Sequence, residues 1–181
     1  FLSLIASGIK EGDEVITTPY TFHATVGAIV TAGAKPVFVD ISDDYNINAN
    51  LIEKAITEKT KVILPVHWSG HSCDLDRIIS ISKKNELVVI EDACHAMGTT
   101  YKTLDYAGIV GDCKFSQACV FSFHPVKAVA MGEGGCVTTN SAEANELLKA
   151  YRNNGMIKNP KRFKNTELAF DSSSEVNQWY Y

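Results

Sequence analysis

The chain has 181 residues and a formal net charge of -4, with 21% charged and 45% hydrophobic residues. This length suffices for one domain with a substantial core, and the acidic balance argues against a nucleic-acid or anionic-membrane binder, which would carry a basic stripe. No apolar run approaches the roughly 18 residues of a membrane helix. The five cysteines include no CxxC pair and predict reduced thiols in a cytoplasmic protein.

Up to residue 93 the sequence alternates short apolar runs with segments of helical spacing. We expect strands at 15–18, 36–41, 61–68 and 87–93 and helices at 1–9, 21–33, 48–60 and 73–85. Apolar strands separated by helices of this length are typical of a parallel sheet that is covered on both faces. The sequence therefore predicts an α/β protein.

After residue 93 the rhythm changes, and strands joined by loops are expected. These strands are predicted at 98–102, 118–123 and 135–140, followed by a last helix at 141–153. We expect one domain over 1–155 and a polar, irregular segment over 156–181. Because the chain opens within a helical pattern and stops on WYY, we interpret it as a piece of a longer protein.

Residues that follow the predicted strands carry most of the candidate chemistry. In open α/β sheets a ligand sits outside the carboxyl ends of the strands. That rule selects Thr17-Thr18, His67-Trp68, Glu91-Asp92 and the segment 122–127. We therefore expect hydroxyls, an imidazole, carboxylates and one lysine at a common edge of the sheet.

Lys127 stands alone as a charge in the stretch FSFHPVKAVAMGEGG, until Glu133 closes it. A lysine ammonium ordinarily titrates with a pKa of about 10.4, and apolar surroundings favour the neutral amine. A neutral lysine can form a Schiff base with a carbonyl group. The alternative is a lysine that extends past the turn into solvent.

Asp92 ends a strand in which a carboxylate is costly unless it meets a cation. A pyridoxal phosphate ring needs such an aspartate opposite its pyridine nitrogen, so that the protonated ring acts as an electron sink. Glu91 competes for this role, but neighbours on a strand face opposite ways, so one of the two should point at the ligand. The alternative is that Asp92 caps a following helix.

Three motifs together resemble the DegT-type sugar-nucleotide aminotransferases: GDEVITTPYTFHAT, EDACHAMG, and SFHPVK before a glycine turn. These are pyridoxal-phosphate enzymes of the aspartate-aminotransferase fold, and the motifs occur in one collinear order over nearly the whole chain. The resemblance implies a three-layer αβα fold with a mostly parallel sheet, the large domain of fold type I. It also implies a phosphate-binding loop before Phe1 and a C-terminal domain after residue 181, so we expect this piece alone to bind cofactor weakly.

The resemblance also assigns roles to individual residues. Lys127 matches the lysine that joins the cofactor aldehyde, and Asp92 the aspartate at the pyridine nitrogen. His95 matches a position near the phenolic oxygen, Ser122 a serine that bonds the phosphate, and Phe22 the aromatic residue that stacks on the ring. For Phe22, a core position in its helix remains an equal alternative.

A narrower resemblance, to the pseudaminic-acid branch of the family, rests on GDCKFSQACVFSFHPVK with EGG, RNNGMIKNP and WYY. That branch aminates carbon 4 of a UDP-linked 4-keto-6-deoxy-N-acetylhexosamine, so the resemblance implies glutamate and a UDP-keto-sugar as substrates and a homodimer. Two departures stand out. Ala128 to Met131 replace hydroxyl residues that are usual after the lysine, and His23 replaces a small apolar residue.

Two other classes of protein stay open. A zinc hydrolase would draw on ligand types that are all present: His67, His71, Cys73, Cys94, His95 and His124. Against it, Ser69 and Gly70 make the HxxxH segment a poor helix. A non-catalytic sensor or scaffold could retain the fold, but folding requires neither Lys127 nor Asp92.

Overall fold

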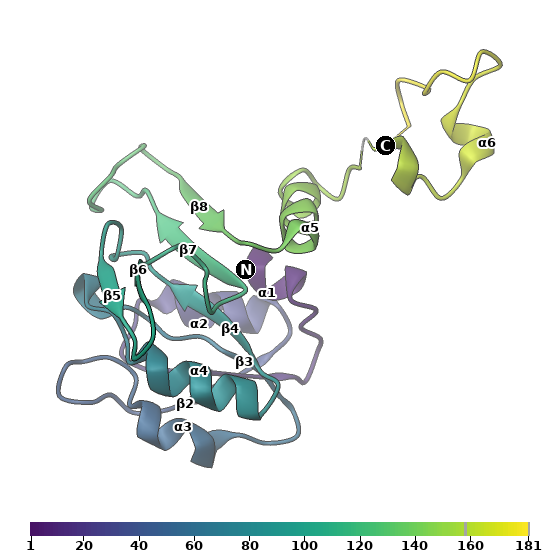
Figure 1. Cartoon of the computed structure of the whole chain (residues 1–181). Helices are drawn as coiled ribbons and strands as arrows, with labels where there is room; N and C mark the ends of the chain where they lie inside the picture. Colours follow the sequence, from purple (N-terminus) through teal and green to yellow (C-terminus); the bar gives the residue numbers. More distant parts are fainter. Residues whose placement is uncertain (158, 181) are drawn as a thin grey trace.

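The computed structural model describes residues 1–157 and 159–180. Its centre is a six-stranded sheet (Figure 1) with the strand order β2-β1-β3-β4-β7-β8. The strands of this sheet are β1 (Glu14–Thr17), β2 (Lys35–Phe38), β3 (Thr60–Ile63), β4 (Val88–Asp92), β7 (Ala118–Ser122) and β8 (Gly135–Thr138). Two further strands, β5 (Thr100–Lys102) and β6 (Ala107–Ile109), form an antiparallel hairpin.

The helices of the described residues fall before, between and after these strands. They are α1 (Leu2–Ala6), α2 (His23–Thr31), α3 (Ala49–Ala55), α4 (Leu75–Lys84), α5 (Ala142–Arg152) and α6 (Thr166–Ala169), with the short 3-10 turns η1 (Trp68–Gly70) and η2 (Pro160–Arg162). None of these helices is both long enough and apolar enough to cross a membrane.

Neighbouring strands from β2 to β7 run parallel, whereas β8 pairs antiparallel with β7. Successive parallel strands need crossover connections, and a helix supplies each of the first three. Helix α2 joins β1 to β2, α3 joins β2 to β3, and α4 joins β3 to β4. The predicted α/β architecture with a mostly parallel sheet is confirmed.

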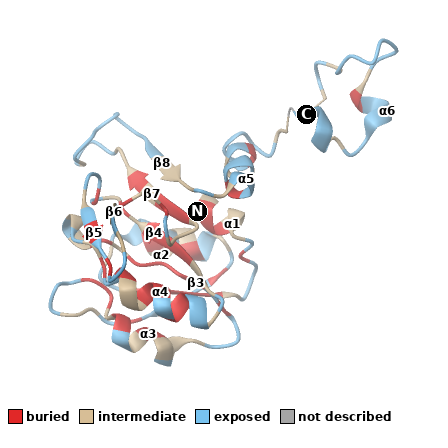
Figure 2. Cartoon of the chain, in the orientation of Figure 1, coloured by how far each residue is buried: buried red, intermediate tan, exposed pale blue. Residues whose placement is uncertain are grey.

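Buried residues form a core on each face of the sheet, and Figure 2 shows the central strands in red between the helices. One core joins the strands to α3 and α4: Ile16, Ile52, Ile63, Ile78, Ile81 and Val89. The other joins them to α1 and α2: Leu4, Val15, Ile29, Val62, Ile90 and Ala118. Because successive strand residues point to opposite faces, the sheet is the middle of three layers.

The helix expected over 48–60 is shorter in the structure, since α3 ends at Ala55. Beyond it, Thr60 N donates to Thr57 O at 3.1 Å, and Thr57 N donates to Thr60 Oγ1 at 2.9 Å. These two bonds close a turn that leads the chain into β3. The turn therefore overrides the helical spacing of the apolar residues.

After α5 the chain leaves the sheet, and residues 159–180 form an arm that projects away from it (Figure 1). Within the arm the Phe163 ring lies 4.9 Å from the Tyr180 ring and 6.2 Å from the Phe170 ring, centroid to centroid. Residues 158 and 181, which belong to two of the motifs used above, lie outside the described residues. The domain boundary at residue 155 stays a prediction.

Candidate active site

The predicted site residues come from the carboxyl ends of three parallel strands. Asp92 and His95 lie at and after the end of β4, and Ser122 and Lys127 lie at and after the end of β7. Phe22 follows β1 and immediately precedes α2. Because β4 pairs directly with β7, the first four residues lie at neighbouring strand ends.

The threonines expected at this edge after β1 are closed to a ligand. Thr17 is fully buried, and its Oγ1 donates to Leu64 O at 2.8 Å. Thr18 is also buried, and its Oγ1 accepts from Tyr20 N at 3.2 Å. Thr17 gives its proton to the backbone and both side chains are buried, so neither hydroxyl is exposed at this edge as the sequence predicted.

Glu91 and His67 form a buried pair that belongs to the core. His67 Nε2 lies 2.8 Å from Glu91 Oε2, and His67 Nδ1 accepts from Cys73 N at 3.1 Å. Since Nδ1 is an acceptor, the ring proton sits on Nε2 and is donated to the carboxylate. Ser116 Oγ also donates to Glu91. The imidazole and Glu91 are therefore committed to each other and to the loop after β3.

Asp92, the next residue on β4, is only half-buried. Its Oδ2 accepts from Thr25 Oγ1 at 2.8 Å, and its Oδ1 accepts from Cys94 N at 3.2 Å. An ionised carboxylate offers about four lone-pair positions, so both oxygens keep room for another donor. The residues after Asp92 form a turn and not a helix, so the helix-cap alternative is wrong.

The Cys94 thiol beside Asp92 stays protonated at neutral pH. Burial, reinforced by the negative charge of Asp92, raises the pKa of this thiol to about 12, while Lys127 opposes the shift. Cys94 therefore contributes its backbone N–H to the site and no thiolate.

Lys127 is half-buried in the loop between β7 and β8, where its backbone N donates to His124 O at 2.9 Å. The apolar residues around it do not enclose it: Val126, Val129 and Met131 are 78%, 46% and 65% exposed. The expected apolar pocket is thus not formed by these neighbours. The loop joins the antiparallel strands β7 and β8, and these side chains are exposed to solvent instead of buried in the core.

The His95 imidazole is influenced by both Asp92 and Lys127. Desolvation of the imidazole and the nearby positive charge of Lys127 lower the pKa of His95, and the Asp92 carboxylate opposes them. Opposite charges from β4 and from the loop after β7 therefore meet at this side chain, which is exposed as a whole.

Ser122 and Phe22 complete the predicted set. Ser122 is half-buried, and its Oγ accepts from His124 N at 3.3 Å, so its own proton is free for another acceptor. Phe22 is 68% exposed and its ring centroid lies 4.1 Å from that of His23. This exposure rules out the core position that the sequence left open for Phe22.

Thr25 and Thr21 are the site neighbours that sequence reasoning missed. Thr25 Oγ1 bonds Asp92 across 67 positions of the chain, and it also bonds Thr21 Oγ1 at 2.8 Å. The available signal was their spacing: within the helix predicted over 21–33, two hydroxyls four residues apart share one face, although the structure begins α2 only at His23. A buried hydroxyl on the face of α2 that packs against the sheet needs a hydrogen-bond partner on the sheet, and Asp92 is that partner for Thr25.

The zinc alternative finds no support. Within residues 1–157 and 159–180, no three His, Cys, Asp or Glu side chains gather as a metal site. His67 is held by Glu91, and His71 Nε2 lies 3.5 Å from Asp44 Oδ2 at the surface. Burial raises the pKa of the Cys73 thiol, which disfavours the thiolate that zinc requires.

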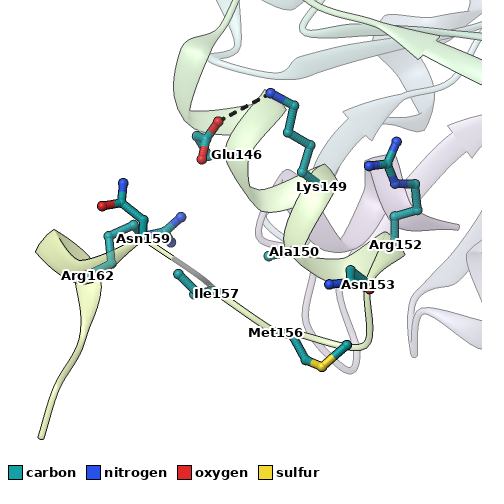
Figure 3. A pocket seen from close by; sticks show the side chains of 9 residues that line it. All are labelled: Glu146, Lys149, Ala150, Arg152, Asn153, Met156, Ile157, Asn159 and Arg162. Carbon is teal, nitrogen blue, oxygen red and sulfur yellow. Dashed lines mark hydrogen bonds and ion pairs between the residues drawn. The ribbon is translucent and has the colours of Figure 1, made fainter. Parts of the chain in front are cut away.

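A hollow of about 600 Å³ lies between the end of α5 and the segment that follows it (Figure 3). Lys149 and Arg152 line it from α5 and Arg162 lines it from η2. Glu146 Oε1 already accepts from Lys149 Nζ at 3.5 Å. None of the predicted site residues lines this hollow, so it is separate from the edge formed by β4 and β7.

Solved structures define the class of this fold. PseC of Helicobacter pylori, an aminotransferase involved in pseudaminic acid biosynthesis, superposes with a TM-score of 0.78 and 33% identity over 99% of this chain and 45% of its own. NtdA of Bacillus subtilis with bound cofactor PMP gives a TM-score of 0.78 and 33% identity over 87% of this chain and 35% of its own. The fold is that of the pyridoxal-phosphate-dependent aminotransferases of fold type I.

A model of the DegT/DnrJ/EryC1/StrS aminotransferase family matches residues 1–173, and the chain belongs to this family. Among its relatives, the spore coat polysaccharide biosynthesis protein SpsC of Bacillus subtilis is 41% identical over all of this chain and 43% of its own length. The UDP-4-amino-4-deoxy-L-arabinose–oxoglutarate aminotransferase of Shewanella sediminis is 43% identical over 86% of this chain and 38% of its own. The chain thus spans about two fifths of the length of these relatives.

Proposed function

We propose that the protein uses pyridoxal phosphate to transfer an amino group from glutamate to a keto-sugar nucleotide. The observation that carries this proposal is the Asp92 carboxylate. It stands half-buried at the end of β4, accepts one hydrogen bond on each oxygen, and keeps acceptor capacity on both. Lys127 follows the adjacent strand, and its charge and that of Asp92 both reach His95, where they shift its pKa in opposite directions.

The residues present fit the cofactor by their chemistry. Asp92 offers an anion for the pyridine nitrogen, and Lys127 offers an amine for the aldehyde. Ser122 has a free hydroxyl proton for a phosphate oxygen, and Phe22 has an exposed ring for stacking. His95 is exposed and is influenced by both charges, and the resemblance assigns it to the region of the phenolic oxygen.

When bound, the cofactor supplies a cationic ring that accepts the electron pair released from the substrate carbon. The protein's own part is to keep that ring protonated and to move a proton. Asp92 holds the pyridine nitrogen proton by charge and by a hydrogen bond. The Lys127 amine would take the proton from the substrate carbon as a general base and, once protonated, would serve as the general acid. A neutral amine is required for the first of these steps.

For the substrate we propose carbon 4 of a UDP-linked 4-keto-6-deoxy-N-acetylhexosamine, in surface-glycan or pseudaminic acid biosynthesis. The motifs around Lys127 and in 152–160 support this choice, as do the pseudaminic-acid aminotransferase among the structural neighbours and the UDP-sugar aminotransferase among the relatives. The division into a cofactor domain over 1–155 and a connecting segment over 156–181 is part of the same proposal.

We further propose a cytoplasmic homodimer. The apolar side chains around Lys127, of which Val126 and Met131 are the most exposed, are suited to cover by a second copy of the chain. Such cover would supply the low-dielectric surroundings that favour a neutral lysine amine.

Visible spectroscopy of the whole protein tests this function. We expect the protein with bound pyridoxal phosphate to absorb in the visible range, and glutamate without a sugar to abolish that absorbance. A keto-sugar nucleotide added next should restore it, with UDP-linked 4-keto-N-acetylhexosamines more effective than 3-keto analogues. Cofactor absorbance that glutamate leaves unchanged would favour the alternative of a non-catalytic sensor or scaffold.

A further inference from the structure

Two hydroxyls at the N-terminal end of α2 form a chain that ends on Asp92: Thr21, in the bend before the helix, and Thr25, inside it. Thr25 is 6% exposed and lies on the same face of α2 as the fully buried Ile29, four residues further on. The O–O distances from Thr21 to Thr25 and from Thr25 to Asp92 are both 2.8 Å. Both distances are those of good O–H···O hydrogen bonds.

The direction of the chain follows from proton counting. A threonine hydroxyl has one proton, and that of Thr25 is donated to Asp92 Oδ2. Thr25 Oγ1 must therefore accept in its contact with Thr21, so Thr21 donates to Thr25 and Thr25 donates to Asp92. Hydrogen bonds aligned in this way polarise each other, and the second one ends on a carboxylate, which makes it charge-assisted.

We propose that Thr25 is a positioning residue for the reaction: its hydroxyl fixes the rotation of the Asp92 carboxylate so that one oxygen faces the pyridine nitrogen. This inference rests on the proposed function. A threonine in a helix has few χ1 rotamers, and burial against the sheet limits them further. Thr25 Oγ1 is therefore a fixed donor, whereas water in its place would follow the carboxylate as it turned.

The same helix turn links the acid to the proposed stacking residue. Thr25 N donates to Phe22 O at 3.1 Å, so the two residues are tied through the first turn of α2. Phe22 begins this turn with an extended backbone and an exposed ring. One short segment, TFHAT, thus carries both the donor to the carboxylate and the exposed aromatic ring.

Other titratable groups lie near Asp92. The His95 imidazole after β4 is coupled to the Asp92 carboxylate, and Lys127 after β7 acts on the same imidazole. The Cys94 thiol is neutral at working pH, because its pKa is raised to about 12. A substitution at Thr25 changes none of these groups. A shift in the pH at which the pyridine nitrogen loses its proton would therefore result from loss of the Thr25 hydroxyl.

The test uses Thr25→Val, which keeps the shape of the side chain and removes the donor. In the whole protein loaded with ¹⁵N-labelled pyridoxal phosphate, we expect the pyridine nitrogen to lose its proton at lower pH than in the parent. The dissociation constant for the cofactor should rise on the order of tenfold, the factor typical of a lost charge-assisted bond. Thr25→Ser retains the hydroxyl and should restore both properties.

Thr60→Val is the matched control. Thr60 is a buried threonine at the opposite end of the sheet, and its Oγ1 accepts from Thr57 N. This variant should lower thermal stability without changing the nitrogen titration. If Thr25→Val does not fold, Thr25→Ala replaces it, and the titration of the ¹⁵N-labelled pyridine nitrogen is measured in the same way.

A pyridine nitrogen that keeps its proton to the same or a higher pH in the Thr25 variants contradicts the inference and leaves the proposed function standing. A parent protein that binds no pyridoxal phosphate at Lys127 removes the proposed function itself. The two failures are therefore distinguishable in one set of samples.

Discussion

The two halves of the candidate site are built in different ways. At the end of β4, the Asp92 carboxylate is held by Thr25 and by its own turn, and its neighbour Glu91 is locked into a buried network. After β7, Lys127 sits in a loop whose apolar side chains are largely exposed. The described residues therefore hold the acid in place by their own contacts, whereas the residues of this loop do not by themselves enclose the lysine.

The largest effect is expected on the lysine side. Lys127→Ala removes both the covalent attachment and the group that moves the proton, so turnover with glutamate should fall by roughly 10³ or more. Single-turnover rates measure this fall. Lys10→Ala, which removes an exposed lysine near the start of β1, should behave as the parent. An unchanged rate in Lys127→Ala would assign the chemistry to another residue.

On the acid side we expect a fall of about 10² to 10³ in the same rate for Asp92→Asn. The amide carries no charge to hold the pyridine nitrogen proton, and the ring then stabilises the developing carbanion poorly. The dissociation constant for the cofactor should change by a smaller factor than the turnover rate. Parental turnover in this variant would show that Asp92 does not face the nitrogen.

Substitution of the neighbouring carboxylate, Glu91, should change stability and not the catalytic rate. Glu91→Ala leaves the His67 N–H and the Ser116 O–H without their acceptor in the core, which should cost about 3 kcal/mol of unfolding free energy. Urea titration measures the loss, and Glu58→Ala on the surface is the control. A Glu91 variant of parental stability would mean that water replaces the carboxylate in this network.

The smallest effect is expected in the loop around Lys127. Val129→Asp places a charge on a 46% exposed side chain, so the fold should lose no more than about 0.5 kcal/mol. Self-association, measured by sedimentation, should weaken on the order of tenfold, because a buried charge opposes the proposed dimer contact. Leu104→Asp, at a site that is 89% exposed, should leave association unchanged. Equal association in both variants argues against a dimer contact at this loop.

Much of the fold was predictable because it depends on local periodicity. The strands and helices up to Asp92 follow from apolar runs and helical spacing, and their alternation alone implies a parallel sheet. The short strand β6 was not expected, since three residues, AGI, carry too little pattern to separate from a loop. The end of α3 was missed because a side chain of the next strand, Thr60, closes the turn.

The candidate site was predictable by residue type and not by contact. Motifs identified Lys127 and Asp92, but the bond from Thr25 to Asp92 joins positions 67 residues apart, which no local pattern reveals. The expectation of an apolar pocket around Lys127 failed for a related reason. Apolar composition indicates that a segment needs cover, and it does not say which part of the protein provides it.

Borohydride reduction of the whole protein, followed by peptide mass analysis, tests the central claim most directly. We expect a pyridoxyl group on the peptide that contains Lys127, and loss of this adduct when glutamate is added before the reductant. An unmodified Lys127 peptide, or an adduct on a different lysine, would contradict the account.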